Sequence, residues 1–393
     1  MTQHKIDISY LIRQLEALLG IDSPTGYTDQ VVRYCTGELE RLGLEPELTR
    51  RGAIRAIRRG GQPEGARAFI SHVDTLGAQI KYVKENGRLE LVPIGHWSAR
   101  FAEGARATIY SERGSFRGTI LPIKASGHTF NMEIDELPIG WQYVELRIDA
   151  ITRNRAETLT LGIDVGDTVA IDPQPEFLSN GFINSRHLDD KAGVAVALSA
   201  IEYMQRANVK TPVDIHWLFT IAEEVGVGAA AILNPEVASM VTIDNGTIAP
   251  GQNSSEFGAT IAMADQTGPF DYHLTRKLSD LCRENGISFQ KDVFRYYRSD
   301  SASAIEAGHD VRTALIAFGI DASHGYERIH MDALSAVGQL LIAYAASPLQ
   351  IERDTEELSS IEGFTVQPTK RATQPKSANF PEHTVASLQK TKS

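Results

Sequence analysis

The pattern of the chain changes twice, and no other feature of the sequence constrains the fold as much. On both sides of residues 75–177, apolar segments typical of buried strands alternate with segments of helical periodicity. This alternation predicts an α/β fold with a mainly parallel sheet. Residues 75–177 instead contain short alternating segments separated by Gly, Asn and Pro turns, without a long helical period. They predict an inserted β-barrel or β-sandwich.

The length supports a division into domains. A chain of 393 residues exceeds the usual size of a single hydrophobic core. We therefore expect an α/β domain formed by residues 1–74 and 178–350, with residues 75–177 as an inserted β-rich domain. Residues 351–393 are rich in Thr, Ser, Lys, Pro and Gln, and this composition predicts a disordered tail.

Composition argues against several classes of protein. The formal net charge is −11 and Lys and Arg form no dense run, which argues against binding to nucleic acid or to a membrane surface. No apolar stretch is long enough to span a bilayer, and residues 1–10 lack the pattern of a secretory signal. The two cysteines, Cys35 and Cys282, are too few for a disulfide scaffold or a thiolate metal cluster. The sequence therefore predicts a cytoplasmic protein.

Acids and histidines gather in five short segments that lie far apart in the sequence. These segments are Ser71–Asp74, His187–Lys191, Ala222–Gly226, Thr242–Asn245 and Ala322–Gly325. Four of them coincide with the end of an expected strand or the start of an expected helix, including a helix start at Glu224. The fifth follows an expected strand at 313–320. Because ligands of an open α/β sheet bind beyond the carboxyl ends of its strands, the segments predict one shared site.

The residue types in these segments suit a site for two divalent cations. Two such ions about 3.5–4 Å apart can share an activated water and polarise a carbonyl oxygen. Asp189, in a polar turn before a helix, is the candidate for the carboxylate that bridges both ions. Imidazole and carboxylate groups are ligands that zinc, cobalt and manganese accept. His72 and Asp244 are candidates for one ion, and Glu224 and His324 for the other.

Two further acids adjoin these candidates. Glu223 can accept a proton from the activated water as general base and pass it to the leaving amine. Asp74 lies two residues after His72, on the same side of a strand, and can orient its imidazole. The ordinary alternatives are caps, turns and exposed charges: Asp189 and its neighbour could cap a helix, and Asp244 could form an Asx turn. The coincidence of five segments favours the metal site.

The same segments resemble those of metallopeptidase family 42, which includes the tetrahedral aminopeptidases, and the resemblance covers most of residues 8–348. The motifs that carry it are Ser-His-Val-Asp-Thr-Leu-Gly at 71–77, Gly-Asp-Thr-Val-Ala-Ile-Asp-Pro at 166–173, Leu-Asp-Asp-Lys-Ala-Gly-Val-Ala-Val-Ala at 188–197, Ala-Glu-Glu-Val-Gly-Val-Gly-Ala at 222–229 and Ser-Asp-Ser-Ala at 299–302.

This resemblance implies a metallo-exopeptidase domain with a mainly parallel sheet (phosphorylase/hydrolase-like), interrupted by a β-barrel dimerisation domain. It implies two divalent metal ions per subunit, zinc first with cobalt or manganese as alternatives, and a homo-oligomer built from dimers, up to a dodecamer. The expected substrate is a short peptide, hydrolysed by a metal-bridging hydroxide with Glu223 as general base. The ligands carried over are His72, Asp189, Glu224, Asp244 and His324. The Asp189-Asp190 peptide is expected to be cis, as in the wider clan of two-metal peptidases.

Two questions stay open at this point. The last ligand of the family usually lies in an Arg-Tyr-Ile-His-Ser-Pro context, whereas residues 321–330 read Asp-Ala-Ser-His-Gly-Tyr-Glu-Arg-Ile-His. His324 fits the family spacing from Asp300, and His330 is the alternative. The segment at 323–328 is also similar to a bacterial branch associated with the osmolyte N-acetylglutaminylglutamine amide. That branch implies an acyl-peptide or amide hydrolase acting on a blocked dipeptide.

A third class of function is a non-catalytic assembly protein on the same scaffold. The presence of Glu223 together with the complete set of ligand candidates argues against it. A comparison of free-amine, acetylated and amidated dipeptides separates the two enzymatic alternatives.

Overall fold

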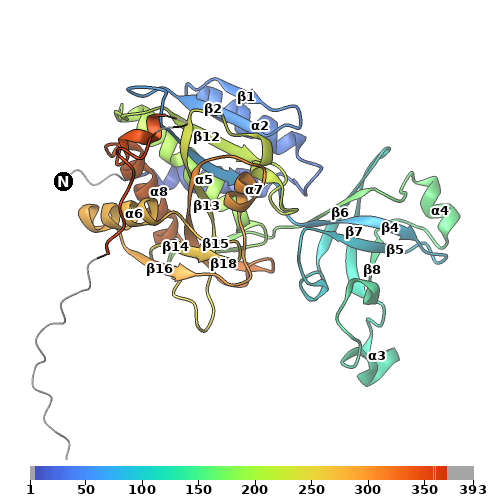
Figure 1. Ribbon diagram of the computed structural model, residues 1–393. Helices are drawn as coiled ribbons and strands as arrows, with labels where there is room; N and C mark the ends of the chain where they lie inside the picture. Colours follow the sequence, from blue (N-terminus) through green and yellow to red (C-terminus); the bar gives the residue numbers. More distant parts are fainter. Residues whose placement is uncertain (1–4, 357, 359, 370–393) are drawn as a thin grey trace, which may run out of the picture.

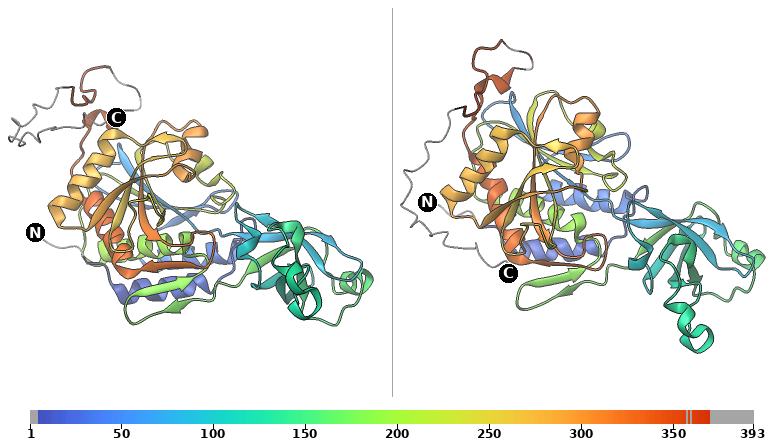
Figure 2. Two further views of the ribbon diagram at one scale, coloured as in Figure 1. Left: turned by 90° about the horizontal axis from the view of Figure 1, so that it is seen from below. Right: turned by 60° about the horizontal axis from the view of Figure 1, so that its bottom comes forward.

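An α/β body carries a β-barrel that projects from one side of it (Figures 1 and 2). The computed structural model describes residues 5–356, 358 and 360–369. Both parts predicted from the change in sequence pattern are present, and the insert is a closed barrel rather than a sandwich. The predicted fold class is therefore confirmed.

The body is built on a sheet of nine strands within the described residues. The strands are β1 (Pro46–Leu48), β2 (Ile54–Arg58), β3 (Ala66–His72), β12 (Ile215–Thr220), β13 (Val237–Thr247), β14 (Ala259–Asp265), β15 (Gly268–Pro269), β16 (Phe289–Val293) and β17 (Arg312–Ile320). They run in the order β1-β2-β12-β3-β13-β17-β14-β15, with β16 beside β14. The four central strands, β12, β3, β13 and β17, are mutually parallel, so their carboxyl ends meet at one edge of the sheet.

Helices cover both faces of this sheet. The main helices are α1 (Ile8–Leu19), α2 (Asp29–Arg41), α5 (Leu188–Arg206), α6 (Tyr272–Asn285), α7 (Asp300–Glu306) and α8 (Met331–Ala346). Along β13, Ser239 contacts Tyr344 of α8, whereas Thr242 contacts Ser301 of α7. Because odd and even residues of a strand point to opposite faces, α7 and α8 lie on opposite sides of the sheet. Helix α5 packs between α1 and α8.

The barrel has its own apolar core. Its strands are β4 (Gly77–Val83), β5 (Leu89–Ile94), β6 (Arg106–Ser111), β7 (Gly114–Pro122), β8 (Val144–Ile148) and β9 (Thr168–Ile171), closed in the order β4-β5-β8-β7-β6-β9. Closure removes the free edges that an isolated sheet would expose. Side chains such as Ile80, Leu91, Ile109 and Leu146 fill the interior. The short helices α3 (Gly127–Phe130) and α4 (Arg155–Thr160) lie on the outside of the barrel (Figure 1).

A small three-stranded sheet joins distant parts of the body. It consists of β10 (Glu176–Phe177), β11 (Phe182–Ser185) and β18 (Glu327–His330), in the order β10-β11-β18. Because β11 leads into α5 and β18 follows the loop after β17, this pairing brings the start of α5 close to that loop.

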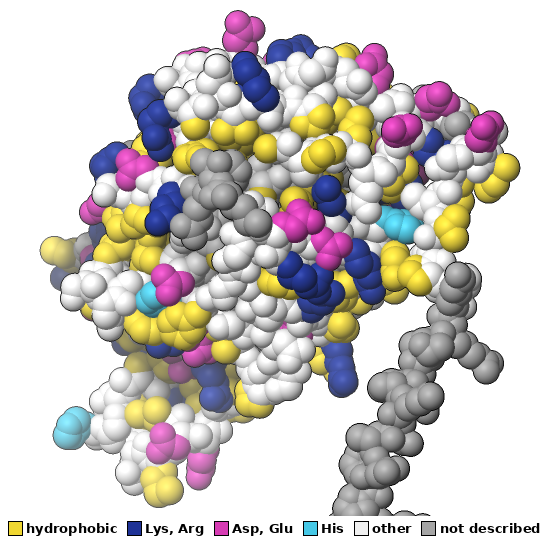
Figure 3. Space-filling view, turned by 90° about the vertical axis from the view of Figure 1, so that its left-hand side faces the viewer, with side chains coloured by type: hydrophobic (Ala, Val, Ile, Leu, Met, Phe, Trp, Pro, Cys, Tyr) yellow, Lys and Arg dark blue, Asp and Glu magenta, His cyan; other side chains and the backbone are white. Residues whose placement is uncertain are grey.

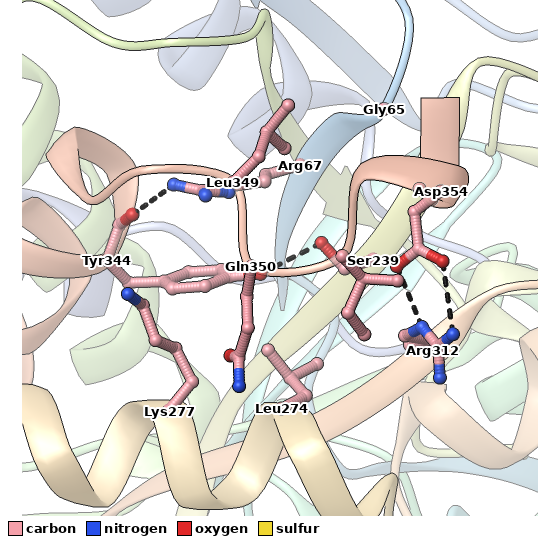
Figure 4. Close-up of a pocket in the computed structure, with 12 residues that line it drawn as sticks. Gly65, Arg67, Ser239, Leu274, Lys277, Arg312, Tyr344, Leu349, Gln350 and Asp354 are labelled. Atoms are coloured by element: carbon pink, nitrogen blue, oxygen red, sulfur yellow. Dashed lines mark hydrogen bonds and ion pairs between the residues drawn. The ribbon is translucent and has the colours of Figure 1, made fainter. Parts of the chain in front are cut away.

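A buried arginine forms hydrogen bonds at the carboxyl end of α8 (Figure 4). Arg67 is only 3% exposed, and its guanidinium donates to the carbonyl oxygens of Tyr344, Ser347 and Pro348. The arginine thus binds carbonyl groups in the last turn of α8 and in the two residues that follow it. Beyond this point Asp354 accepts two hydrogen bonds from Arg312, at 2.8 and 3.0 Å. The first residues of the segment expected to be a tail thus pack on the body, whereas 370–393 lie outside the described residues.

The surface is mixed in charge. On the face shown in Figure 3, Lys and Arg side chains lie beside Asp and Glu side chains. Among the residues that the structure describes, no helix combines the length and the apolar character needed to cross a bilayer.

Candidate metal centre

The predicted site residues meet at the edge where the four parallel strands end. Across this edge, β12 is followed by Glu223 and Glu224, β3 ends at His72, β13 carries Asp244, and β17 leads to His324. Asp189 lies opposite them, at the start of α5. Parallel strands deliver these side chains to one place although they are far apart in the sequence.

Asp189 lies between the two histidines. Its Oδ1 is 3.3 Å from Nε2 of His72, and its Oδ2 is 3.3 Å from Nε2 of His324. Each of its oxygens therefore faces a different imidazole, as a carboxylate bridging two ions would. Asn245 donates to Asp189 Oδ2 at 2.7 Å and fixes the carboxylate in this orientation.

The surrounding acids divide into two groups, one around each histidine. His72, Glu223 and Asp244 offer ligand atoms within 4.8 Å of one another, and so do Asp189, Glu224 and His324. Nε2 of His324 is 3.6 Å from Oε2 of Glu224, and Nε2 of His72 is 3.8 Å from Oε2 of Glu223. All six predicted ligand and base residues are thus brought together.

The hydrogen bonds of both histidines leave Nε2 available for a metal. His72 Nδ1 lies 2.9 Å from the Asp74 carbonyl oxygen, and His324 Nδ1 lies 2.8 Å from that of His96. A carbonyl oxygen only accepts, so Nδ1 carries a hydrogen in each ring, and once Nε2 has lost its own proton it presents a lone pair to the site. A metal-ligating histidine commonly has this arrangement.

His330 cannot play the same part. Its Nε2 lies 3.0 Å from the Asn180 carbonyl oxygen, and its Nδ1 accepts from the Asp332 backbone at 3.1 Å. Both ring nitrogens are therefore occupied, the second as a cap at the start of α8. Of the two histidines that the sequence left open, only His324 lies among the acids of the centre.

The sequence predicts that the Asp74 carboxylate orients the His72 imidazole, but in the structure this carboxylate forms its hydrogen bonds with other groups. It lies 3.6 Å from His72 Nδ1, farther than the Asp74 carbonyl oxygen that binds this nitrogen. Instead it accepts the backbone N–H groups of Glu223 and Glu224, at 3.2 and 3.4 Å, and the hydroxyl of Thr25 at 2.7 Å. Asp74 therefore holds the two glutamates at the centre and orients His72 through its backbone.

Asp190 ties the turn before α5 to the end of β3. Its Oδ2 accepts from the Ser71 hydroxyl and, at 3.1 Å, from the His72 backbone N–H. Gly193 permits this approach, since a Cβ there would lie 2.1 Å from Asp190 Oδ1. The Asp189-Asp190 peptide bond is cis, which confirms that prediction.

The segment with the two glutamates is a loop, and the helix predicted to start at Glu224 is wrong. The structure has only a 3-10 turn at Gly228–Ala231. Gly226 has a φ of +81°, which a helix does not accommodate. At Gly228 a Cβ would lie 2.2 Å from Oδ1 of Asp300. Asp300 itself binds the Ala229 N–H at 2.8 Å and Thr220 at 2.6 Å, which anchors the loop.

Glu327 is a buried acid that the sequence analysis did not single out. It accepts the backbone N–H of Asp189 at 3.2 Å and that of His324 at 2.9 Å. Burial, together with the nearby Asp189, raises the pKa of its carboxyl group to about 8. Glu327 thus links the loop that carries His324 to the turn that carries Asp189. The pairing of β11 with β18 brings Glu327 close to this turn.

The acids and histidines shift one another's pKa. Burial and then Asp189 raise the pKa of Asp244 well above its usual value. Burial raises the pKa of Glu224 to about 7. Burial alone would lower the pKa of His324, but Glu224 and Asp189 raise it to about 10. Burial alone would raise the pKa of Asp189, but its contacts with His324 and His72 lower it.

These residues fit a pair of divalent cations. Imidazole nitrogen and carboxylate oxygen are the donor types that zinc, cobalt and manganese accept. Within the described part of the chain, the buried atoms Asp189 Oδ1 and Glu224 Oε1 have no hydrogen-bond partner. Buried acceptors normally have a partner, and cations would serve both atoms.

Comparison with known proteins identifies the family of this chain. The model of the M42 glutamyl aminopeptidase family matches residues 52–340, which span all the residues named above as ligand candidates. The chain belongs to this family. It is therefore a metal-dependent peptidase, a hydrolase, and the divalent metals that the family implies suit the donor set at the sheet edge.

Two relatives of known sequence have aminopeptidase names. Putative aminopeptidase YhfE of Bacillus subtilis (strain 168) is 36% identical over 336 residues, which cover 85% of this chain and 97% of that protein. Glutamyl aminopeptidase of Lactococcus lactis subsp. cremoris (strain MG1363) is 23% identical over 258 residues, 63% of this chain and 70% of that protein.

Solved structures share the fold. A TET aminopeptidase from the archaeon Thaumarchaeota archaeon SCGC AB-539-E09 has a TM-score of 0.79 at 16% identity, covering 88% of this chain and 98% of its own. The TET1 peptidase of Pyrococcus horikoshii, described as assembling into a tetrahedron or a large octahedral shell, has a TM-score of 0.75 at 22% identity, with 85% and 99% covered.

Proposed function

We propose that this chain is a two-metal aminopeptidase that removes the N-terminal residue of short peptides. The observation that carries the proposal is the position of Asp189, with one oxygen toward His72 and the other toward His324. Each histidine has a further acid on its own side, Asp244 for the first and Glu224 for the second. The proposed ligands are thus His72 and Asp244 at one ion, Glu224 and His324 at the other, and Asp189 at both.

Two divalent ions held there would lower the pKa of a water and polarise the carbonyl of the scissile bond. Glu223 is suited to take the proton from that water. Its Oε2 lies 3.8 Å from His72 Nε2, on the side of the cluster where Asp244 also lies. Burial raises the pKa of Glu223 well above its usual value, and a raised carboxyl pKa favours both accepting and returning a proton.

The proton path follows from this position. As the water oxygen bonds to the carbonyl carbon, its proton passes to Glu223. When the bond between carbon and nitrogen breaks, Glu223 gives the proton to the leaving amine and returns to its charged form. The backbone N–H of Glu223 is held by Asp74, so the base stays in place through both transfers.

A comparison of blocked and unblocked peptides tests the reaction class. Dipeptides and tripeptides with a free amine should be cleaved by the metal-loaded protein, and their N-acetylated counterparts should not. Cleavage of the acetylated set alone would contradict the aminopeptidase proposal and favour the acyl-peptide hydrolase that the resemblance of the segment at 323–328 implies. No cleavage of either set, with both metals bound, would favour a non-catalytic role.

We also propose that the subunit forms homo-oligomers through the β-barrel at residues 77–171, which projects from the body (Figure 1). The fold shared with a peptidase described as a tetrahedral or octahedral shell supports the assembly. Light scattering should give a mass of at least two chains at micromolar concentration. A stable monomer at that concentration would contradict the proposal.

A further inference from the structure

The loop at residues 21–27 adjoins the end of β3, which carries part of the metal centre, and none of its residues takes part in the proposed reaction. The Thr75 N–H donates to the Ser23 carbonyl oxygen at 2.9 Å, and the Thr25 N–H donates to the Thr75 carbonyl oxygen at 3.1 Å. The Ser23 hydroxyl donates to the Val73 carbonyl oxygen at 2.8 Å. The loop is therefore fixed to the end of β3.

Two other parts of the chain bind the same loop. Lys191 of α5 is only 1% exposed, and its Nζ donates to the carbonyl oxygen of Ile21. From β6 of the barrel, the Tyr110 hydroxyl donates to Asp22 Oδ2 at 2.7 Å. The ring of Tyr110 also stacks on that of Tyr27, with centroids 4.4 Å apart. Because the body and the barrel both hold the loop, its backbone has a defined position.

The side chain of Thr25 connects this loop to the metal centre. Its hydroxyl donates to Asp74 Oδ2 at 2.7 Å. The same carboxylate accepts the backbone N–H of Glu223 at Oδ1, at 3.2 Å, and that of Glu224 at Oδ2, at 3.4 Å. Without the hydroxyl, Oδ2 would keep only the longest of these three bonds. The last torsion of an aspartate has a broad range, so the carboxylate would then be free to turn away from the Glu223 N–H.

We propose that Thr25 is a positioning residue for the general base Glu223 and acts through Asp74. This role rests on the proposed function. Glu223 lies in a loop, so its N–H has no helix or strand partner and depends on Asp74. The base must face the water during the first proton transfer and the leaving amine during the second. Even a small misplacement of a catalytic group, caused by a substitution elsewhere, lowers the rate strongly.

Two substitutions separate the hydroxyl from the rest of the side chain. Thr25→Val keeps the branched shape and removes the donor, whereas Thr25→Ser keeps the donor and removes the methyl group. Thr275→Val is the matched control, because the Thr275 hydroxyl donates to the Asp271 carbonyl oxygen at 2.8 Å in the first turn of α6. The Asp271 N–H in turn donates to Thr313, near the start of β17, at the opposite end of the sheet from the metal centre.

The assay measures turnover at saturating metal together with hydrogen exchange. Loss of a residue that supports a metal site lowers activity by about 10–100-fold, so kcat of Thr25→Val should fall by about tenfold or more with KM nearly unchanged. Thr25→Ser should recover most of kcat. Mass spectrometry should show faster exchange in the segment with the Glu223 and Glu224 N–H groups of Thr25→Val, but not of Thr25→Ser. Thr275→Val should lose thermal stability and keep both kcat and the exchange rate of this segment.

Three results would overturn the role. Equal losses of kcat in Thr25→Val and Thr25→Ser would mean that the methyl group matters instead of the hydroxyl. A normal kcat of Thr25→Val in excess metal would mean that Thr25 supports only metal binding. Unchanged exchange in Thr25→Val would mean that Asp74 holds the glutamates without its help. If the wild-type protein cleaves no free-amine peptide, the proposed function fails, and the exchange rates still show whether Thr25 fixes the Glu223 backbone.

Discussion

Replacing His324 and His330 in turn should separate metal binding from helix capping. His324→Ala removes a ring nitrogen that lies 3.3 Å from Asp189 and 3.6 Å from Glu224. Removing a residue that only hydrogen-bonds to a metal ligand already lowers metal affinity by about 10–100-fold. Removing the ligand itself should therefore lower metal affinity by more than about 100-fold. One metal per chain should remain after dialysis, with little activity.

His330→Ala should instead lower stability. The variant loses the cap on the Asp332 N–H, worth about 1 kcal/mol, and the ring contacts with Phe182 and Phe257, whose centroids lie at 4.8 and 4.9 Å. A total of about 1–2 kcal/mol corresponds to a fall in Tm of roughly 1–3 °C for a chain of this size. Metal content and kcat should stay near those of the wild type.

The assay combines elemental analysis after dialysis with thermal unfolding of the metal-saturated proteins. Loss of a metal from His330→Ala, with both metals retained by His324→Ala, would refute the choice of His324 as a ligand. Equal loss of metal from the two variants would also refute it, because the hydrogen bonds of His330 leave neither of its nitrogens for a cation.

Two further outcomes are expected. Metal affinity should rise with pH between about 6 and 10, because ligands bind a metal when they are deprotonated. In the metal-free centre the pKa is about 7 at Glu224 and about 10 at His324. Calorimetry in buffers of different ionisation enthalpy should show that metal binding releases protons, and an affinity that does not change with pH would contradict this. Gly228→Ala should weaken metal binding and stability, because its Cβ would lie 2.2 Å from Asp300 Oδ1, whereas Gly37→Ala, in α2 with open space around it, should be neutral or about 0.5–1 kcal/mol more stable by urea unfolding.

Strand periodicity was enough to predict which residues the sheet brings close together. His72 and Asp244 lie on parallel neighbouring strands, and their meeting follows from the sheet alone. The position of Asp189 follows from the start of α5. Periodicity could not decide between His324 and His330. That choice depends on their hydrogen bonds to His96 and Asn180, which lie in distant parts of the chain.

The loops were the least predictable part. Glu223 and Glu224 suit a helix start by composition, but the positive φ of Gly226 and the contact of Gly228 with Asp300 hold them in a loop. The contact of Asp74 with Thr25 joins the first loop of the chain to β3, and no local pattern announces it. Asn245, on β13, also binds a ligand candidate, Asp189. Its position next to Asp244 could have marked it as part of the site.

Metal content and turnover of Glu223→Gln test the central claim most directly. The substitution keeps the size of the side chain and leaves the five proposed ligands in place, but the amide cannot accept the water's proton. Two metals per chain should remain, and kcat should fall by about 10²–10⁴-fold with KM little changed. Loss of a metal would make Glu223 a ligand instead of a base. Near-normal turnover with both metals bound would contradict the account.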